Sequence, residues 1–199
     1  MDKNQKNALQ SEKNKNSLLI PFVIALIGAL LLVATIFLPF ASATEEHQEY
    51  LQKHSEEMYA EEINMTNEDA VTISIFEFGR IYAAAISLER YVDIAIACLI
   101  VIVGFALLVA LTTLFAVLKK AIITLIFNLL SFGAFQIIKW DFEDRGVLPS
   151  SSYDFGIAQY ACYVGIIAVM VGAVALLVAK IKNKKQLKSQ NANIMEVVQ

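Results

Sequence analysis

Four uninterrupted apolar segments dominate the pattern of this sequence, and each is long enough to cross a membrane. They cover residues 18–40, 94–118, 121–138 and 157–179, and none of them contains a charged residue. A membrane-spanning helix needs about 20 apolar residues, within a range of about 17–25. The third segment is near the lower limit, but Lys139 can reach the headgroup level and Trp140 is typical of the interface. The sequence therefore predicts four transmembrane helices.

Polar segments separate these helices and predict an all-α fold, a four-helix transmembrane bundle with an acidic extracytoplasmic cap. The two lysines at 119–120 predict a tight hairpin between the second and third helices. The polar ends of the chain are rich in Lys, Asn and Gln, which is typical of disorder. We expect two cytoplasmic tails, residues 1–17 and 180–199, and two outer loops, residues 41–93 and 139–156.

The distribution of charge predicts the orientation. Of the 16 Lys and Arg residues, 11 lie in the two tails and the hairpin turn, whereas 16 of the 19 Asp and Glu residues lie in the two outer loops. Positively charged segments stay on the cytoplasmic side of a membrane. We therefore expect both termini in the cytoplasm and a plasma-membrane location. The net charge of only −3 gives no reason to expect a nucleic-acid partner.

The first outer loop predicts two helices separated by a break. The stretch "TEEHQEYLQKHSEEMYAEE" (residues 44–62) is polar and helix-forming, and Thr66 or Asn67 can cap a second helix. The following "AVTISIFEFGRIYAAAISLERY" is too charged for a fifth span, so we expect it to pack on the helix ends or to lie in the interface. Its "VTISI" portion alternates and alternatively fits a short strand.

The first apolar segment also allows a second interpretation, a cleaved signal peptide. Ala41, Ser42 and Ala43 fit an A-x-A cleavage site after a basic leader. However, the apolar core of a signal peptide has about 7–15 residues, and this segment has 23. We expect the segment to remain as a helix, and cleavage after Ala43 stays open as the alternative.

Small residues form a continuous seam along the fourth helix. They recur at spacings of four and three, at Ala161, Gly165, Ala168, Gly172, Ala175 and Ala179. Small side chains let two membrane helices approach closely enough for extensive van der Waals contact. The seam therefore predicts a helix-packing face, either for the first helix or for a second copy of the chain.

The third helix carries three polar residues on one face, Thr124, Asn128 and Ser131. Polar groups at bilayer depth need hydrogen-bond partners, so this face predicts contacts between helices or the polar lining of a solute path. Because the deep parts of the helices contain no ionisable residue, we favour packing. Cys98 and Cys162 lie at similar depth, where a disulfide is conceivable but a small apolar filler is the commoner role.

The stretch "KWDFEDRG" (residues 139–146) is the most conspicuous candidate for chemistry. Asp141, Glu143 and Asp144 could act as acid and base groups of a membrane-surface enzyme. The alternative, which we favour, is an interfacial helix end formed by Lys139, Trp140 and Asp141, followed by an outer loop. His47 and His54 are seven residues apart, too far along a helix to share one metal ion, so we expect no metal, cofactor or catalytic residue.

The order of motifs resembles a group of small bacterial four-span membrane proteins of unknown function. The resemblance rests on a first span ending in "FLPF", the outer-loop stretch "ISIFEFG", the two-lysine hairpin, and a last span opening "YDFGIAQYACYVGIIAVMVGAVALL". It implies a multi-pass envelope protein and carries no activity with it. The cysteine motifs of claudins and tetraspanins are missing from the outer loops.

These observations favour a non-enzymatic accessory, interaction or scaffold protein of the cell envelope. Its expected partners are the bilayer, anionic lipid headgroups at the basic tails, and a membrane protein or a second copy of the chain. The alternatives are a small transporter or channel subunit that uses the polar face of the third helix, and an enzyme that uses the outer-loop carboxylates.

Overall fold

Four long helices form most of the structure, a computed structural model that describes residues 3–90, 92–144, 148 and 151–198. Side chains are described for residues 17–90, 92–143, 148 and 151–186. The long helices are α1 (Lys3–Thr35), α4 (Val92–Val117), α5 (Ala121–Asp144) and α6 (Ile157–Val198). Each contains a segment long and apolar enough to cross a membrane: Ser17–Thr35, Val92–Val117, Ala121–Glu143 and Ile157–Gln186.

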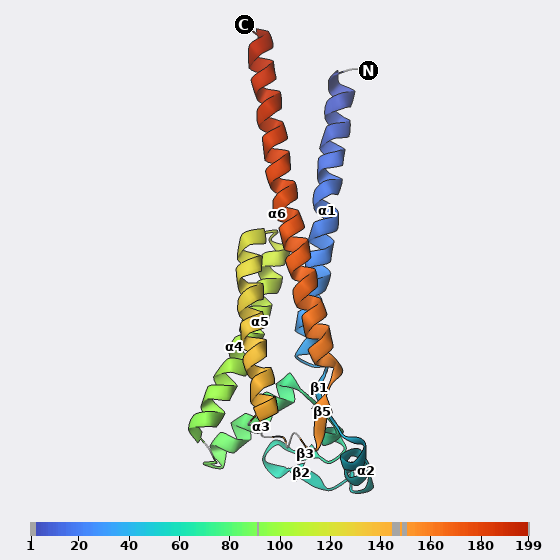
Figure 1. Ribbon diagram of the computed structural model, residues 1–199, viewed down its shortest axis with the longest axis vertical. Helices are drawn as coiled ribbons and strands as arrows, with labels where there is room; N and C mark the ends of the chain where they lie inside the picture. Colours follow the sequence, from blue (N-terminus) through green and yellow to red (C-terminus); the bar gives the residue numbers. More distant parts are fainter. Residues whose placement is uncertain (1–2, 91, 145–147, 149–150, 199) are drawn as a thin grey trace.

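The long helices pack side by side in a defined order (Figure 1). α1 contacts α6 and α4, and α5 contacts α4 and α6. The two termini lie toward one end of the molecule, and the loops gather at the other end (Figure 1). We call the loop end, residues 36–90 together with residues 148 and 151–156, the cap.

The helices extend beyond the apolar segments at the end that carries the termini. The polar ends of the chain, which we expected to lack regular structure, continue α1 back to Lys3 and α6 out to Val198. Lys, Gln and Leu are good helix formers, and extending an existing helix is far easier than nucleating one. At the cap end α1 stops at Thr35, because Pro39 and the residue before it disfavour further helix.

A small sheet ties the two loops of the cap together. β1 (Pro39–Ala43) lies between β4 (Thr72–Ser74) and β5 (Tyr153–Phe155), and both pairings are antiparallel. Ala41, inside the possible cleavage motif, is fully buried and stands opposite Ile73 on one side and Phe155 on the other. The motif therefore forms the central strand of the sheet. The expected all-α fold is therefore incomplete, because the cap contains this sheet and a hairpin of β2 (Met58–Ala60) and β3 (Met65–Thr66).

The cap helices differ from the predicted ones. α2 (Glu45–Lys53) stops well before residue 62, and a 3₁₀ turn, η1 (Glu61–Ile63), follows β2. Leu51 is the only buried residue of α2, and a polar helix without an apolar face gains little from packing. The next helix, α3 (Ile75–Ser87), is capped by Ser74, so the expected cap at Thr66 or Asn67 is wrong.

The capping interaction at Ser74 is reciprocal. The backbone N–H of Glu77 donates to the Ser74 hydroxyl at 3.2 Å, and the Glu77 carboxylate accepts from the Ser74 N–H at 2.8 Å. This S-x-x-E pattern is readable in the sequence as a capping box. Thr66 instead exchanges hydrogen bonds with Asp69, and the 3₁₀ turn η2 (Asp69–Val71) follows Glu68 without a side-chain cap. The "VTISI" alternative was right in part, because Thr72–Ser74 is a strand.

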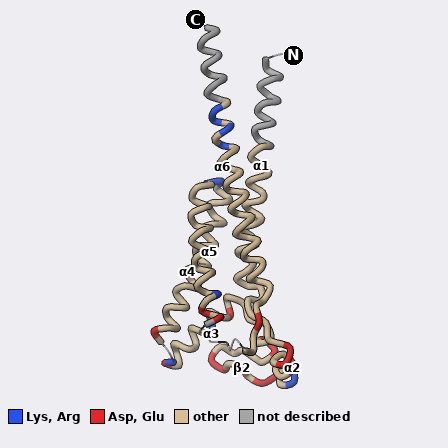
Figure 2. The backbone as a smooth tube through the Cα atoms, in the orientation of Figure 1, with Lys and Arg blue, Asp and Glu red and all other residues tan. Residues whose placement is uncertain are grey.

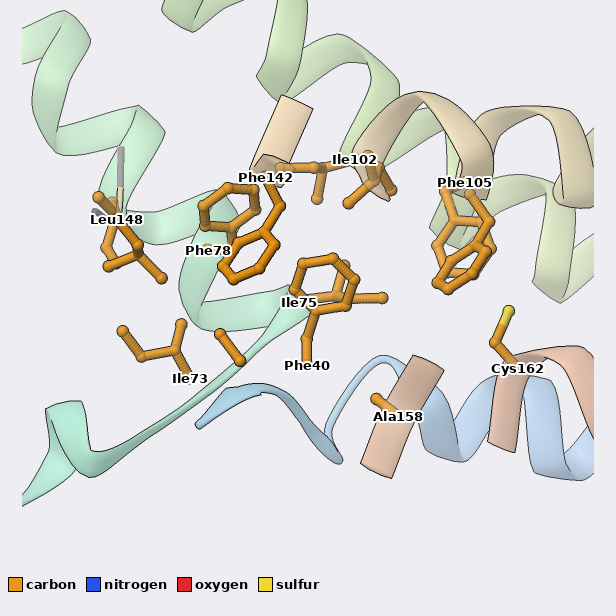
Figure 3. Packing of buried hydrophobic residues seen from close by; sticks show 14 of the residues in the cluster. Phe40, Ile73, Ile75, Phe78, Ile102, Phe105, Phe142, Leu148, Ala158 and Cys162 are labelled. Carbon is orange, nitrogen blue, oxygen red and sulfur yellow. The ribbon is translucent and has the colours of Figure 1, made fainter. Parts of the chain in front are cut away.

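An aromatic cluster joins the cap to the long helices. Phe40 of β1 is fully buried, and its ring lies 5.9 Å from Phe78 of α3, 6.3 Å from Phe135 and 5.5 Å from Phe142 of α5. Figure 3 shows Phe40 in the middle of this cluster, with Phe78 and Phe142 beside it. Burying an aromatic ring contributes about 1.5–3 kcal/mol. The cap is therefore fixed to the helices by a continuous core.

Candidate functional site

The cap holds a large cavity that lies against the beginning of α4. This cavity, which we call the cap groove, has a volume of about 800 Å³ and is bounded by β2, η1, α3 and the start of α4. Its floor contains the buried residues Ile81, Tyr82 and Ala95. Ala84 and Ala85 line the wall on α3, and their short side chains leave room that larger residues would fill.

The rim of the cap groove combines exposed apolar side chains with charges of both signs. Met58, Leu88 and Ile94 are 40%, 38% and 41% exposed. Glu61 and Glu62 lie on one side in η1, and Arg90 comes from the segment between α3 and α4. Ligand pockets of about 300–1,000 Å³ with apolar walls and a few polar groups are typical of small-molecule sites.

A buried carboxylate lies beneath the groove. Asp141 of α5 is only 5% exposed, and the hydroxyl of Tyr82 donates a short hydrogen bond to its Oδ2 atom. The Cys98 thiol of α4 donates to Oδ1 at 3.3 Å. The cluster joins α3, α4 and α5, and it holds the Tyr82 ring in the floor of the groove. Burial and the bond to Asp141 raise the pKa of Tyr82, so the phenol remains the proton donor.

A second, smaller cavity lies on the other side of this cluster. The crevice between α4 and α5 has a volume of about 280 Å³ and is lined mainly by apolar residues, including Val101, Ile102 and Ile137. Asp141 and Trp140 also line it, and it shares Ile94 with the cap groove. The two cavities therefore share one wall residue in the first turn of α4.

Residues 139–144 of the stretch "KWDFEDRG" continue α5, whereas we expected the outer loop to begin there. α5 extends to Asp144, because its buried face continues through Phe135, Ile138 and Phe142. Trp140 is 48% exposed.

Among the proposed acid and base groups of this stretch, the two with described side chains, Asp141 and Glu143, contact different partners. Asp141 points to Tyr82 and Cys98, whereas Glu143 forms an ion pair of 3.4 Å with Lys139. The Asp144 side chain and Arg145 lie outside the described residues. The carboxylates of Asp141 and Glu143 thus have different environments.

The polar face of α5 lies inside the helix packing. Thr124, Asn128 and Ser131 are all buried. The Asn128 amide donates to the carbonyl of Ile166 in α6 at 3.1 Å, and Ser131 lies 3.5 Å from Thr112 of α4. The Thr124 hydroxyl donates to the carbonyl of Lys120, four residues earlier in the chain. None of the three lines the cap groove or the α4–α5 crevice.

The small-residue seam of α6 faces α1. A side chain added at Gly172 would meet the backbone of Ala25, and one added at Gly28 would meet Ala168 and the carbonyl of Gly165. Gly165 and Gly172 are buried, whereas the other members are partly buried: Ala161, Ala168, Ala175 and Ala179. The small residues thus let the backbones of α1 and α6 touch.

The histidines and cysteines have packing roles in the described structure. The ring of His47 contacts those of Tyr50 and Tyr153, and His54 interacts with the carbonyl of Tyr50 at 2.9 Å. Cys98 and Cys162 are thiols. Among the described residues, no group of three or more His, Cys, Asp or Glu side chains is placed to hold a metal ion.

Acidic residues concentrate on the cap, whereas the lysines described in α6 and in the α4–α5 turn lie toward the other end (Figure 2). This separation carries the predicted charge asymmetry into the fold.

No family model, curated protein or solved structure matches the chain. The geometry of the cap is therefore the basis for inferring a function.

Proposed function

We propose that this chain is a non-enzymatic integral membrane protein that acts as an accessory or interaction component of the cell envelope. Its four long helices cross the plasma membrane as a bundle, with both termini in the cytoplasm and the cap outside. The lysines near the termini contact anionic lipid headgroups. The cap groove receives another component of the envelope.

The observation that carries this proposal is the cap groove on its rigid support. The groove has a volume of about 800 Å³ and an exposed apolar rim that includes Met58 and Leu88. Its floor is held by Tyr82 through Asp141, and the cap is joined to the helices by the core around Phe40. Binding to a preorganised surface avoids the entropic cost of ordering it.

Two alternatives receive less support from the same geometry. A transporter that uses Thr124, Asn128 and Ser131 requires access to these residues, but their side chains are buried between helices. An enzyme that uses the carboxylates of α5 requires two of them to face one substrate, but Asp141 is buried and Glu143 pairs with Lys139. Packing and positioning are sufficient to explain both sets.

Site-specific photo-crosslinking in cells tests the interaction. A photoreactive residue replaces Met58 or Leu88 on the groove rim, and the matched control replaces Tyr50, which is 55% exposed on α2 and does not line the groove. We expect the two rim positions to yield the same crosslinked component and the control to yield none of it. If all three positions give the same products, or the rim positions give none, the proposed role of the cap groove is wrong.

A further inference from the structure

We propose that the cap groove binds one phospholipid with a zwitterionic headgroup, with the ammonium group at Glu61 and Glu62 and the phosphate at Arg90. This inference rests on the proposed function, because it names the chemical class of the component that occupies the groove. It follows from three features of the described residues: the apolar walls, the paired charges on the rim, and the position beside a membrane-spanning segment.

The walls of the groove suit a hydrocarbon chain. Met58, Leu88 and Ile94 are each about two-fifths exposed around a floor that contains buried Ile81 and Ala95. Exposed apolar surface of this kind is unfavourable in water. An acyl chain along the groove covers this surface and needs no hydrogen bonds from the walls.

The rim charges suit a headgroup that carries both signs. Glu61 and Glu62 are exposed in η1, and Arg90 is exposed between α3 and α4. In the described part of the chain, the only ion pair is between Lys139 and Glu143, so these three charged groups are available to a ligand. An arginine suits a phosphate, whereas adjacent carboxylates suit an ammonium group. An anionic lipid would satisfy Arg90 but would be repelled by the glutamates.

The position of the groove gives a lipid direct access. Ile94 and Ala95 line the groove and also belong to the first turn of α4, where the candidate span Val92–Val117 begins. The α4–α5 crevice is also lined by Ile94 and provides further apolar surface between the two helices. A lipid can therefore enter from the bilayer while its chain remains in contact with apolar atoms. An extended peptide from a soluble partner has no such continuity.

The test measures lipid selectivity of the purified full-length chain. Native mass spectrometry counts the lipids that remain bound after exchange into micelles with equal amounts of phosphatidylethanolamine and phosphatidylglycerol, which have the same acyl chains. We expect the ethanolamine lipid to be retained about fivefold more than the glycerol lipid, since two exposed ion pairs contribute only modestly. Equal retention, or preference for the anionic lipid, overturns the proposal.

Matched variants assign the effect to the groove. Glu61→Gln with Glu62→Gln should abolish the preference, whereas Glu45→Gln with Glu46→Gln, an acidic pair in the first turn of α2, should leave it intact. Arg90→Gln should lower retention of the ethanolamine lipid, and Lys53→Gln is its control on the cap. All of the substituted residues, Lys53 included, are exposed, so we expect the variants to fold. A preference that survives both groove variants overturns the assignment.

A space-filling variant tests the apolar part separately. Ala85→Trp places a large ring in the wall of the groove and should reduce retention of both lipids about tenfold. Circular dichroism and size-exclusion chromatography confirm folding, and Ala85→Val serves as a milder change if the tryptophan variant aggregates. Unchanged retention in a folded variant places the lipid elsewhere. Selective capture of a peptide in place of a lipid also overturns the proposal.

The outcomes separate this inference from the proposed function. If the rim positions crosslink a protein in cells while the purified chain shows no lipid preference, the lipid inference fails and the interaction role stands. If the purified chain selects the zwitterionic lipid while the cellular crosslinks do not differ from the control, the interaction role fails and lipid binding stands.

Discussion

Gly172 in α6 is the position where a single methyl group should most clearly test the packing of α1 against α6. A Cβ atom at this position would lie 2.4 Å from the backbone nitrogen and 2.8 Å from the Cα atom of Ala25. Ordinary van der Waals contact begins at 3.4 Å, so the two backbones must separate by about 1 Å. Neither obstructing atom belongs to a flexible side chain, and the strain cannot be relieved by a rotamer change.

Gly172→Ala should therefore destabilise the chain even though alanine is the better helix former. Overpacking of this kind costs about 1–3 kcal/mol, and separating the helices also weakens the neighbouring contacts of Gly165 and Gly28. The matched control is Gly133→Ala in α5, where an added Cβ atom meets nothing within 4 Å. This control should be neutral or should stabilise the helix by up to about 1 kcal/mol.

The measurement is reversible unfolding in mixed micelles of a mild detergent and SDS, followed by circular dichroism. Gly172→Ala should unfold at a lower SDS fraction than the original chain, and Gly133→Ala at the same or a higher fraction. Equal behaviour of the two variants would show that the backbones of α1 and α6 do not touch at Gly172. A stabilised Gly172→Ala variant would refute the packing argument outright.

Three further predictions concern the cap and the polar face of α5. Tyr82→Phe should lower the free energy of unfolding by about 1–3 kcal/mol because it leaves a buried oxygen of Asp141 without its donor. In an Asp141→Leu background, measured by the same SDS titration, the loss caused by Tyr82→Phe should be smaller. Hydrogen bonds from the backbone N–H and the hydroxyl of Thr66 lower the pKa of Asp69. The stability that these hydrogen bonds contribute should be present above the unfolded-state pKa of about 3.8 and should be lost as the pH falls through the lower pKa of the folded state. Asp69→Asn should remove this acid dependence of unfolding. Asn128→Leu should leave solute flux in proteoliposomes unchanged, since Asn128 is buried between helices. Its Oδ1 atom has no hydrogen-bond partner in the described structure. A loss of flux in this variant would instead favour a transporter.

The apolar helices were predictable because hydrophobicity and length are local properties of the chain. The segments 94–118 and 121–138 correspond closely to α4 and to most of α5. The capping box at Ser74 and Glu77 was equally local, since the two residues are three apart. Thr66 and Asn67 are also good capping residues, so the local pattern alone does not select Ser74.

The cap could not be derived in the same way because its contacts join distant parts of the chain. β1 takes its partners from β4 and β5, and the residue opposite Ala41 in β5 is Phe155. A three-residue strand such as β5 carries almost no signal of its own, and its structure depends on the strand beside it. The hairpin of β2 and β3 and the early end of α2 have the same origin.

For the candidate site, too, local sequence patterns determine some features and contacts between distant residues determine others. By itself, the sequence determined that four segments suit a bilayer, that acidic residues collect in two loops, and that small residues line one face of the fourth helix, because composition and spacing suffice for each. Only the tertiary structure decided that this face meets α1, that Asp141 is buried beneath Tyr82, and that Glu61, Glu62 and Arg90 surround one apolar groove. Those arrangements depend on contacts between residues far apart in sequence, such as Tyr82 and Asp141 with a separation of 59 positions, and no local pattern records which distant partners meet.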